Sequence, residues 1–435
     1  MSNPKLLYLA NRSESFSNLG QQLSEGKKHL VLSGLVGSGK SFLLSYLKKR
    51  LEVPILVLTY HPDVATKILE DLQSFLGEEE VLFFPSREIL PYELEVPYSE
   101  VLGARLSCLY ELLFQTKKIV VTHIRAVMEK TIPPDELKSK IVQLKIGEEL
   151  EIDDLVKKIL GLGFKRSSQV EEVGTYSQRG GIIDFFPYTT ENPLRIEFIG
   201  NQIESIREFS VFNQRTITRK DEAIILPKRE FYLSDEELEK YFRGLDDEKA
   251  QNLRNRVNLY QEIPGLEWMA PLFKLPQAEL FDYLPKETLC FLDEPELVER
   301  EIGQIWEEAE KRYQEANLRG ELVPKPETFL REETSFEKRI RKFPRLENHY
   351  LKKENPDFDL GMTEPESLLS DFTHLKKSLE VEENGSRSVY ITCENSGQRD
   401  RLEELLEKDA RKVTFLLLNL SSGFVFPELR LTLLP

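Results

Sequence analysis

GLVGSGKS, residues Gly34 to Ser41, is the stretch that decides the fold. It fits the phosphate-binding pattern G-x-x-x-x-G-K-[ST], with an apolar run before it and a helix-like run after it. Backbone N–H groups of such a loop surround phosphate oxygens, Lys40 would reach the β- and γ-phosphates, and Ser41 would hold Mg²⁺. The stretch predicts a strand, a loop and a helix with nucleotide-binding geometry. It does not distinguish this site from a loop that keeps the shape and no longer binds a ligand.

Length and charge limit the classes of function. At 435 residues the chain is too long for one core, and the length favours about three domains. Lys plus Arg number 59 against 75 Asp plus Glu, which gives a net charge of -16. Such a chain does not coat nucleic acid through its net charge, so any nucleic-acid contact must be local.

The cysteines and the first residues indicate the compartment. Cys108, Cys290 and Cys393 are too far apart for a disulfide framework or a zinc site, and the chain starts with neither a basic nor an apolar signal region. No run of 18 apolar residues occurs. A cytoplasmic protein without a membrane segment is predicted.

The first part of the chain alternates strands and helices. Strands are expected at 29–33, 54–60, 81–85 and 118–122, which predicts an α/β domain with a parallel sheet. Residues 142–230 then read as a small α+β domain, with a helix near 153–162 and a tight turn at Gly200-Asn201 between two strands.

A second strand-and-helix segment carries the acidic candidates. The strand 288–292 ends in Asp293 and Glu294, where P-loop proteins keep the carboxylate that organises Mg²⁺. The other reading is a helix start, because Pro295 suits the first helical position, and the pattern leaves both open. The candidate nucleotide residues are thus Gly34, Gly37, Ser38, Gly39, Lys40, Ser41, Asp293 and Glu294, with Ser41 and Asp293 as metal ligands, for ATP and Mg²⁺.

The remaining chain reads as a linker and a third domain. Residues 331–353 are rich in Lys and Arg, which is more typical of a solvated linker than of a phosphate-backbone contact. A strand at 388–393, a helix at 397–409 and a strand at 412–418 follow. The expected division is a P-loop domain in two segments (1–125 and 231–330), an inserted α+β domain (126–230), a basic linker (331–354) and a small α/β domain (355–435).

Several specific motifs carry a family resemblance. They are Phe84-Pro85, Leu90-Pro91-Tyr92, Arg105-Leu106, Leu109-Tyr110, the run GTYSQRG at 174–180 and the run IDFFP at 183–187. On these residues the chain resembles, over essentially its whole length, the N-terminal part of the bacterial transcription-repair coupling factors (Mfd), which is similar to UvrB.

The resemblance implies a RecA-like P-loop domain interrupted by a small domain that docks onto UvrA. In full-length members, domains that bind RNA polymerase and move on DNA follow, so the chain looks like a fragment. The family's UvrA-docking surface uses basic residues, which correspond here to Lys165 or Arg166 and to Arg179, with Tyr176 as the neighbour that excludes water. Without the resemblance, these basic residues would simply cover a strand edge and a helix end.

Two departures from UvrB bear on function. Only residues 93–104 separate Tyr92 from Arg105, too few for the aromatic hairpin with which UvrB grips DNA. The phosphate loop, by contrast, is intact in form. The leading hypothesis is a module that recruits UvrA; the rival is an ATPase, for which residues 388–435 are too short to supply the second lobe that hydrolysis needs.

Overall fold

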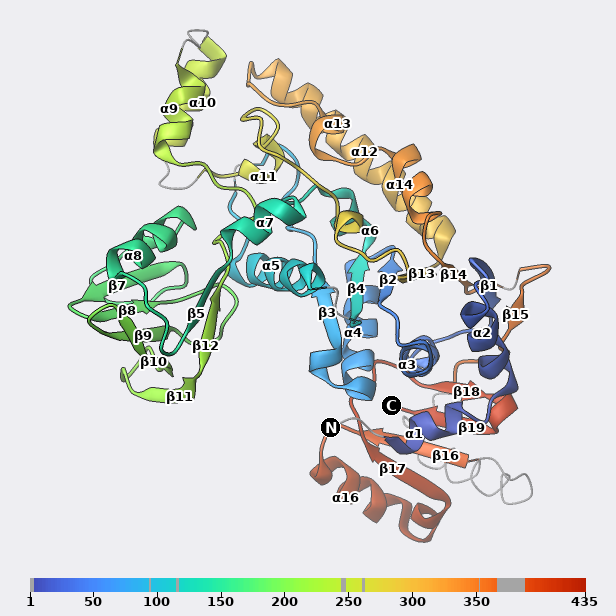
Figure 1. Cartoon of the computed structure of the whole chain (residues 1–435). Coiled ribbons are helices and arrows are strands. Elements are labelled where there is room, and N and C mark those ends of the chain that lie inside the picture. The colour runs from blue at the N-terminus through green and yellow to red at the C-terminus, as the bar shows by residue number, and fades with distance from the viewer. Residues whose placement is uncertain are drawn as a thin grey trace.

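The computed structural model describes residues 4–93, 95–114, 117–243, 248–259, 263–351, 353–365 and 388–435. Figure 1 shows a central sheet with helices around it, a second sheet domain to one side and a third, C-terminal sheet below. The α/β class predicted from the sequence is confirmed by the strand order of the central sheet. Within the described residues, no helix has the length and apolar character required to cross a membrane.

The central sheet has seven parallel strands in the order β15-β1-β14-β13-β2-β4-β3. Three of its inner strands, at 55–59, 119–123 and 289–293, are buried at every residue, as is usual when helices cover both faces of a parallel sheet. The strands are β1 (His29–Ser33), β2 (Ile55–Thr59), β3 (Val81–Phe84), β4 (Ile119–His123), β13 (Leu289–Asp293), β14 (Arg345–His349) and β15 (Phe358–Asp359).

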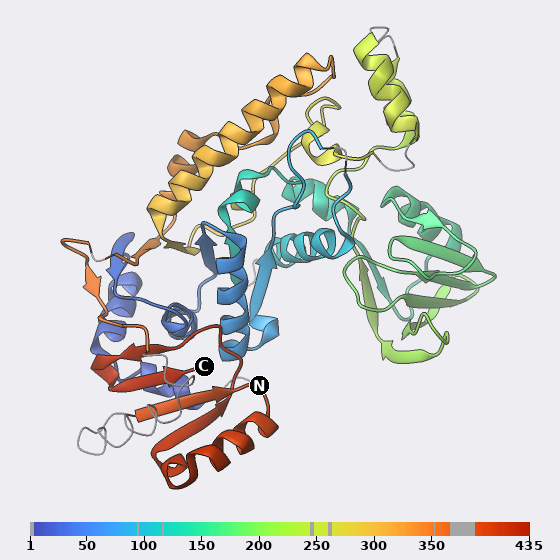
Figure 2. The same ribbon diagram turned by 180° about the vertical axis from the view of Figure 1, so that it is seen from behind.

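Helices surround this sheet and extend from it. The N-terminal helices are α1 (Pro4–Ala10), α2 (Glu14–Ser24), α3 (Gly39–Leu51), α4 (Pro62–Leu76), α5 (Ser99–Leu113), α6 (Ile124–Met128) and α7 (Pro134–Lys140). The later ones are α9 (Asp235–Phe242), α10 (Glu248–Leu259), α11 (Leu266–Met269), α12 (Pro295–Leu318), α13 (Pro326–Phe329) and α14 (Glu333–Ile340). In Figures 1 and 2, α9, α10 and α12 rise away from the sheet at the end opposite the third sheet.

The segment predicted to be a basic linker, 331–354, differs from that expectation. It contains α14, and it contains β14, which pairs with β1 on one side and β13 on the other. The sequence of β14 did not read as a strand because Arg345 and Glu347 interrupt it. These two side chains are 2.9 Å apart and neutralise each other, while Leu346 and Asn348 are fully buried. The segment therefore completes the central sheet.

The inserted domain is a six-stranded sheet in the order β11-β10-β9-β8-β7-β6, with the helix α8 (Ile152–Gly161) and a separate pair β5–β12. Its strands are β5 (Val142–Lys145), β6 (Lys165–Arg166), β7 (Thr175–Arg179), β8 (Ile182–Phe185), β9 (Leu194–Ile199), β10 (Gln202–Phe209), β11 (Thr216–Lys220) and β12 (Glu222–Ile225). The turn expected at Gly200-Asn201 is confirmed, because it joins the antiparallel strands β9 and β10. Gly200 has φ +63°, a conformation that glycine adopts without strain.

The third sheet has the order β17-β16-β19-β18 and packs on the first unit. Its elements are β16 (Ser388–Cys393), α16 (Ser396–Leu406), β17 (Val413–Leu417), β18 (Phe424–Phe426) and β19 (Leu431–Leu434). Phe424 lies against Phe42 with ring centroids 5.5 Å apart, and Phe426 lies against Phe16 at 5.2 Å. Each fully buried Phe contributes roughly 1.5–3 kcal/mol, so one hydrophobic core joins the two sheets. Figure 2 shows the C-terminal strands directly beside the N-terminal helices.

A buried charge cluster fastens the inserted domain at both of its chain crossings. Arg105 on α5 contacts Glu230, where the chain leaves the domain, and Glu129, where the chain enters it. Arg87 contacts the same two glutamates, and the Thr131 hydroxyl donates to Glu230. Burial alone would raise the pKa of Glu230, but the two guanidinium groups outweigh it and hold this pKa well below its usual range. The cluster fixes the domain to the first unit.

Candidate functional site

The phosphate loop connects β1 to α3 and lies at the carboxyl edge of the central sheet. The Lys40 ammonium is 2.7 Å from Asp293 Oδ2, and the Asn348 amide donates to Asp293 Oδ1 at 2.8 Å. Asp293 is fully buried, and Lys40 has 15 % of its side chain exposed. The structure thus brings together Lys40 and Asp293, two of the predicted nucleotide residues. Asn348 is a third member that the sequence did not indicate, because β14 was not predicted.

Ser41, the other predicted metal ligand, faces a different carboxylate. Its hydroxyl is 3.4 Å from Asp71 Oδ2 on α4 and has no hydrogen bond to Asp293. Burial raises the pKa of Asp71 to about 6, although hydrogen bonds from Ser421, Ser38 and Ser41 partly oppose this shift. Among the described residues, no three His, Cys, Asp or Glu side chains form a group that could hold a metal ion. A metal role for Ser41 and Asp293 stays a prediction.

Glu294 is drawn away from the loop. It has φ +57° and precedes α12, which begins at Pro295, so the helix start weighed in the sequence is present. Its carboxylate accepts a hydrogen bond from the backbone N–H of Tyr350, after β14. The helix start is therefore present, and Asp293 contacts Lys40. A role of Asp293 in organising Mg²⁺ stays a prediction.

Residues from the C-terminal part of the chain cover part of the loop. A Cβ at Gly37 would lie 2.5 Å from the carbonyl oxygen of Gly423, so the chain's own backbone covers this position. The Ser38 hydroxyl donates to the carbonyl of Ser422 at 2.5 Å. The backbone N–H groups of Gly39 and Lys40, which a phosphate would need, donate to loop carbonyls. These two N–H groups and the Ser38 hydroxyl are therefore satisfied within the chain.

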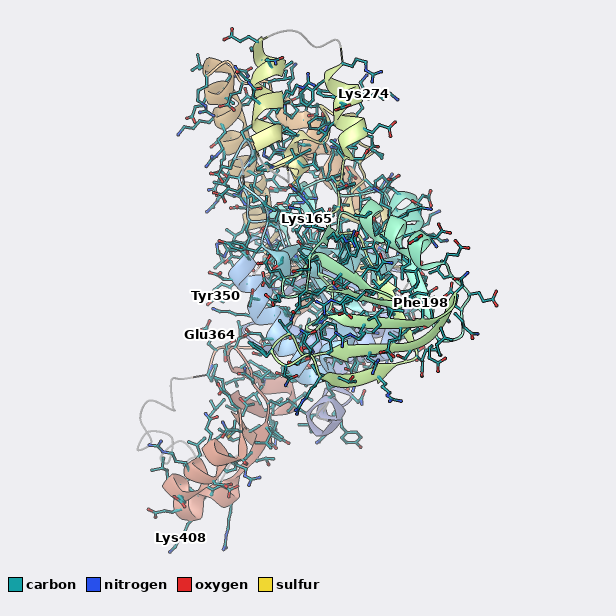
Figure 3. The ribbon with its side chains drawn as sticks, turned by 90° about the vertical axis from the view of Figure 1, so that its left-hand side faces the viewer. Lys165, Phe198, Lys274, Tyr350, Glu364 and Lys408 are labelled. Carbon is teal, nitrogen blue, oxygen red and sulfur yellow. The ribbon has the colours of Figure 1, made fainter. Side chains whose placement is uncertain are left out.

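The second candidate site is the β6–β7 edge of the inserted sheet. Arg166 on β6 and Arg179 on β7 are exposed, and one Arg179 Nη donates to the carbonyl of Ser168 at 2.7 Å. Lys165, labelled in Figure 3, is half-buried on the same edge strand. Tyr176 differs from its expected role, since only 3 % of it is exposed and it packs in the core of this domain. Two exposed arginines therefore define this edge.

The outer face of the same sheet carries charges that the sequence reading missed. Arg195 pairs with Asp184 through two hydrogen bonds of 2.7 and 2.8 Å, and Arg207 pairs with Glu197. Every second residue along 194–199 is buried, and this alternation could have indicated from the sequence that Arg195 and Glu197 face outward. At the opposite edge, β11 is exposed along its whole length, including Arg219.

The basic residues of 331–353 are largely used inside the chain. Arg331 is 1 % exposed, and burial lowers its pKa to about 9 even though it pairs with Glu279. Acidic partners also lie beside other members, in the pairs Arg339–Asp282, Arg341–Glu337, Arg345–Glu347 and Lys353–Glu296. These pairs tie the stretch to the rest of the protein, while Lys338 and Lys342 are exposed.

The region after Tyr92 has no aromatic hairpin among its described residues. Residues 95–98 have no regular secondary structure, and α5 begins at Ser99. The described residues of 93–104 therefore form a loop and the start of α5, as the short spacing between Tyr92 and Arg105 predicted.

Comparison with known proteins gives these sites a context. The family described as the UvrB interaction domain matches residues 142–231, which cover the inserted sheet. A transcription-repair-coupling factor of Myxococcus xanthus is 29% identical over 426 residues, which cover 90% of this chain and 35% of that protein. The chain matches the N-terminal UvrB-like region of the transcription-repair-coupling factors.

Other relatives agree with this assignment. The transcription-repair-coupling factor of Bacillus subtilis is 30% identical over 316 residues, covering 68% of this chain and 27% of that protein. The UvrABC system protein B of Treponema denticola is 24% identical over 344 residues, covering 70% of this chain and 52% of that protein. The matches span 35% and 27% of the lengths of the two coupling factors, so the chain is similar to one region of them.

Proposed function

We propose that this chain is the region of a cytoplasmic transcription-repair coupling factor that recruits UvrA for nucleotide excision repair. The observation that carries the proposal is the inserted sheet, which matches the UvrB interaction domain and presents Arg166 and Arg179 at one exposed edge. Contacts to RNA polymerase and DNA are assigned to other regions of such a factor. The same proposal divides the chain into a first segment (1–125), an inserted domain (126–230), a second segment that extends the expected 231–330 as far as β15, because β14 and β15 pair with β1, and a third domain that follows β15 instead of starting at 355.

The chemistry of the edge suits a carboxylate-bearing partner surface. A guanidinium is planar and permanently charged, and it makes paired hydrogen bonds to a carboxylate. Arg166 is exposed, so docking would desolvate it without breaking a buried pair. Arg179 is held by the carbonyl of Ser168, which orients it before contact. Such preorganised arginines often carry a large share of binding energy.

The rival function, an ATPase that uses its own phosphate loop, has one supporting contact. Lys40 and Asp293 are adjacent, as a nucleotide site requires. Against it, Ser38 and Gly37 are covered by residues 422–423 of the chain itself. The geometry therefore favours recruitment over hydrolysis.

Calorimetry with purified UvrA tests the proposal. Wild-type chain is expected to bind at micromolar affinity or tighter, and the double variant Arg166→Ala, Arg179→Ala to bind about tenfold or more weakly. The matched control is Arg215→Ala, Arg219→Ala, which removes two exposed arginines at the opposite end of the same sheet. The control should bind as wild type does. No binding by folded wild type, or an equal loss in the control, would refute the proposal.

A further inference from the structure

The phosphate loop is intact in sequence, yet the recruitment function does not use it. Residues from the C-terminal part of the chain lie against the loop, and the loop motif alone does not predict this contact. Three features meet there: the glycines of the loop, the hydroxyls of Ser38 and Ser41, and a short segment, residues 419–424, that leads into β18. We call residues 419–424 the seated segment.

Backbone contacts bring the seated segment onto the loop. A Cβ at Gly37 would lie 2.5 Å from the carbonyl oxygen of Gly423 and 3.4 Å from the Cβ of Ser422. Residues 361–362, which lie outside the seated segment, approach the start of the loop in the same way. A Cβ at Gly34 would lie 2.6 Å from the backbone nitrogen of Gly361, and Met362 donates its N–H to the Gly34 carbonyl at 2.8 Å. Because glycine has no side chain, a phosphate can come close to the backbone of such a loop. Here the protein's own backbone occupies that space.

Hydrogen bonds then fix the seated segment. Ser38 and Ser422 exchange two of them, since the Ser38 hydroxyl donates to the Ser422 carbonyl and accepts from the Ser422 N–H at 3.3 Å. Asp71 accepts from the N–H of Ser421 at 2.7 Å and from its hydroxyl at 3.1 Å. Ser38, Asp71 and Ser41 are each at most 1 % exposed. Burial makes these bonds costly to lose, because water does not replace them.

The two ends of the seated segment are anchored independently. The Ser74 hydroxyl, one turn after Asp71 on α4, donates to the carbonyl of Asn419 at 2.6 Å. At the other end Phe424 is fully buried against Phe42 of α3, the helix that follows the loop. The segment is therefore held along its length by the loop, by α4 and by the core.

We propose that the phosphate loop of this chain, together with Asp71 of α4, is a docking seat for residues 419–424 of the same chain, and that this seat excludes nucleoside triphosphates. The loop has the sequence of an anion site, but the Ser38 hydroxyl exchanges hydrogen bonds with the backbone of Ser422, and the N–H groups of Gly39 and Lys40 donate to carbonyls of the loop itself. Lys40 takes no part in holding the segment, because Asp293 neutralises it. The loop thus joins the third sheet to the first unit, a role that is separate from recruitment of UvrA.

A double-mutant cycle on the whole chain tests the seat. Asp71→Ala removes the acceptor and Ser421→Ala removes one donor of the same contact, so their effects on the unfolding temperature should not add. The double variant should unfold close to the temperature of Asp71→Ala alone. The control cycle pairs Asp63→Ala with Ser421→Ala, because Asp63 is an exposed carboxylate on the same helix. The control effects should add, and additive effects in the first cycle would overturn the seat.

Nucleotide exclusion has its own readout, with MgATP at millimolar concentration as the probe. The unfolding temperatures of wild type and Lys40→Ala should each be unchanged by MgATP. A rise for wild type that Lys40→Ala abolishes would show that nucleotide enters the loop, and the proposal would fall. This result would not bear on binding of UvrA, so the two proposals stand or fall separately.

Discussion

The Nε of Arg105 lies 2.5 Å from Glu230 Oε1, and neither side chain has any exposed surface. The pair joins α5 of the first unit to the point where the chain leaves the inserted domain. Arg105→Ala would leave Glu230 charged and buried with only Arg87 to compensate it. We expect the free energy of unfolding to fall by about 3–5 kcal/mol, measured by urea denaturation.

Arg125→Ala provides the comparison for that prediction. Arg125 pairs with Glu301 and Glu308 on α12 at 3.5 and 3.1 Å, but it is 31% exposed. Partly exposed pairs contribute about 1 kcal/mol or less. If Arg105→Ala and Arg125→Ala lowered the free energy of unfolding equally, the buried charge cluster would not be what fastens the inserted domain to the first unit.

Tyr176 provides a prediction that separates packing from binding. Because it is buried in the core of the inserted domain, Tyr176→Ala should lower stability by about 3–5 kcal/mol. Tyr176→Phe keeps the ring and should change the unfolding temperature far less. UvrA affinity of the folded Tyr176→Phe protein should equal that of wild type. If folded Tyr176→Phe bound UvrA more weakly than wild type, Tyr176 would belong to the docking surface after all.

Lys40→Ala is expected to change stability and leave ATP turnover unchanged. Wild-type chain should hydrolyse MgATP no faster than Lys40→Ala, with or without DNA, in a phosphate-release assay. Removal of Lys40 leaves the buried Asp293 with the Asn348 amide as its remaining described partner, so unfolding should become easier by about 3 kcal/mol or more. Robust turnover that disappears in the variant would contradict this expectation and favour the ATPase.

Asp71 predicts how stability depends on pH. Its pKa rises from 3.8 unfolded to about 6 folded because it is buried, so the folded protein binds the proton more tightly. The resulting stabilisation is complete below about pH 4 and is lost as pH rises through 6, with a magnitude on the order of 3 kcal/mol. Asp71→Asn should remove this part of the pH dependence. Unfolding at pH 4.5, 5.5 and 6.5 would measure the difference, and parallel curves for the two proteins would contradict it.

Local patterns in the sequence predicted most of the central sheet. β2, β4 and β13 are buried on both faces, so each reads as a continuous apolar run and was placed within a residue or two. β14 escaped because Arg345 and Glu347 give it a polar sequence, and their mutual neutralisation is visible only once the strand is formed. Asn348, which completes the contact with Asp293, was missed for the same reason.

The candidate sites show the limit of local reasoning more clearly. Lys40 and Asp293 could be paired from the motif and the strand order that it implies. The seating of Ser422 against Ser38 joins residues from opposite ends of the chain, and no pattern within the eight-residue motif encodes it. Tyr176 was assigned to a surface by its closeness to Arg179 in sequence, but strand alternation turns the two residues to opposite faces.

The position of β14 between β1 and β13 has a consequence for biosynthesis. His29 aligns with Arg345, so β1 emerges from the ribosome long before the strand that must lie beside it. Until then β1 lacks its inner neighbour, and the sheet has a gap that other strands could occupy. Pairings between such distant segments close slowly. We expect β2, β4 and β13 to assemble first and β1 to join only when β14 has been synthesised, so β1 stays open to incorrect pairing until residues 345–349 emerge.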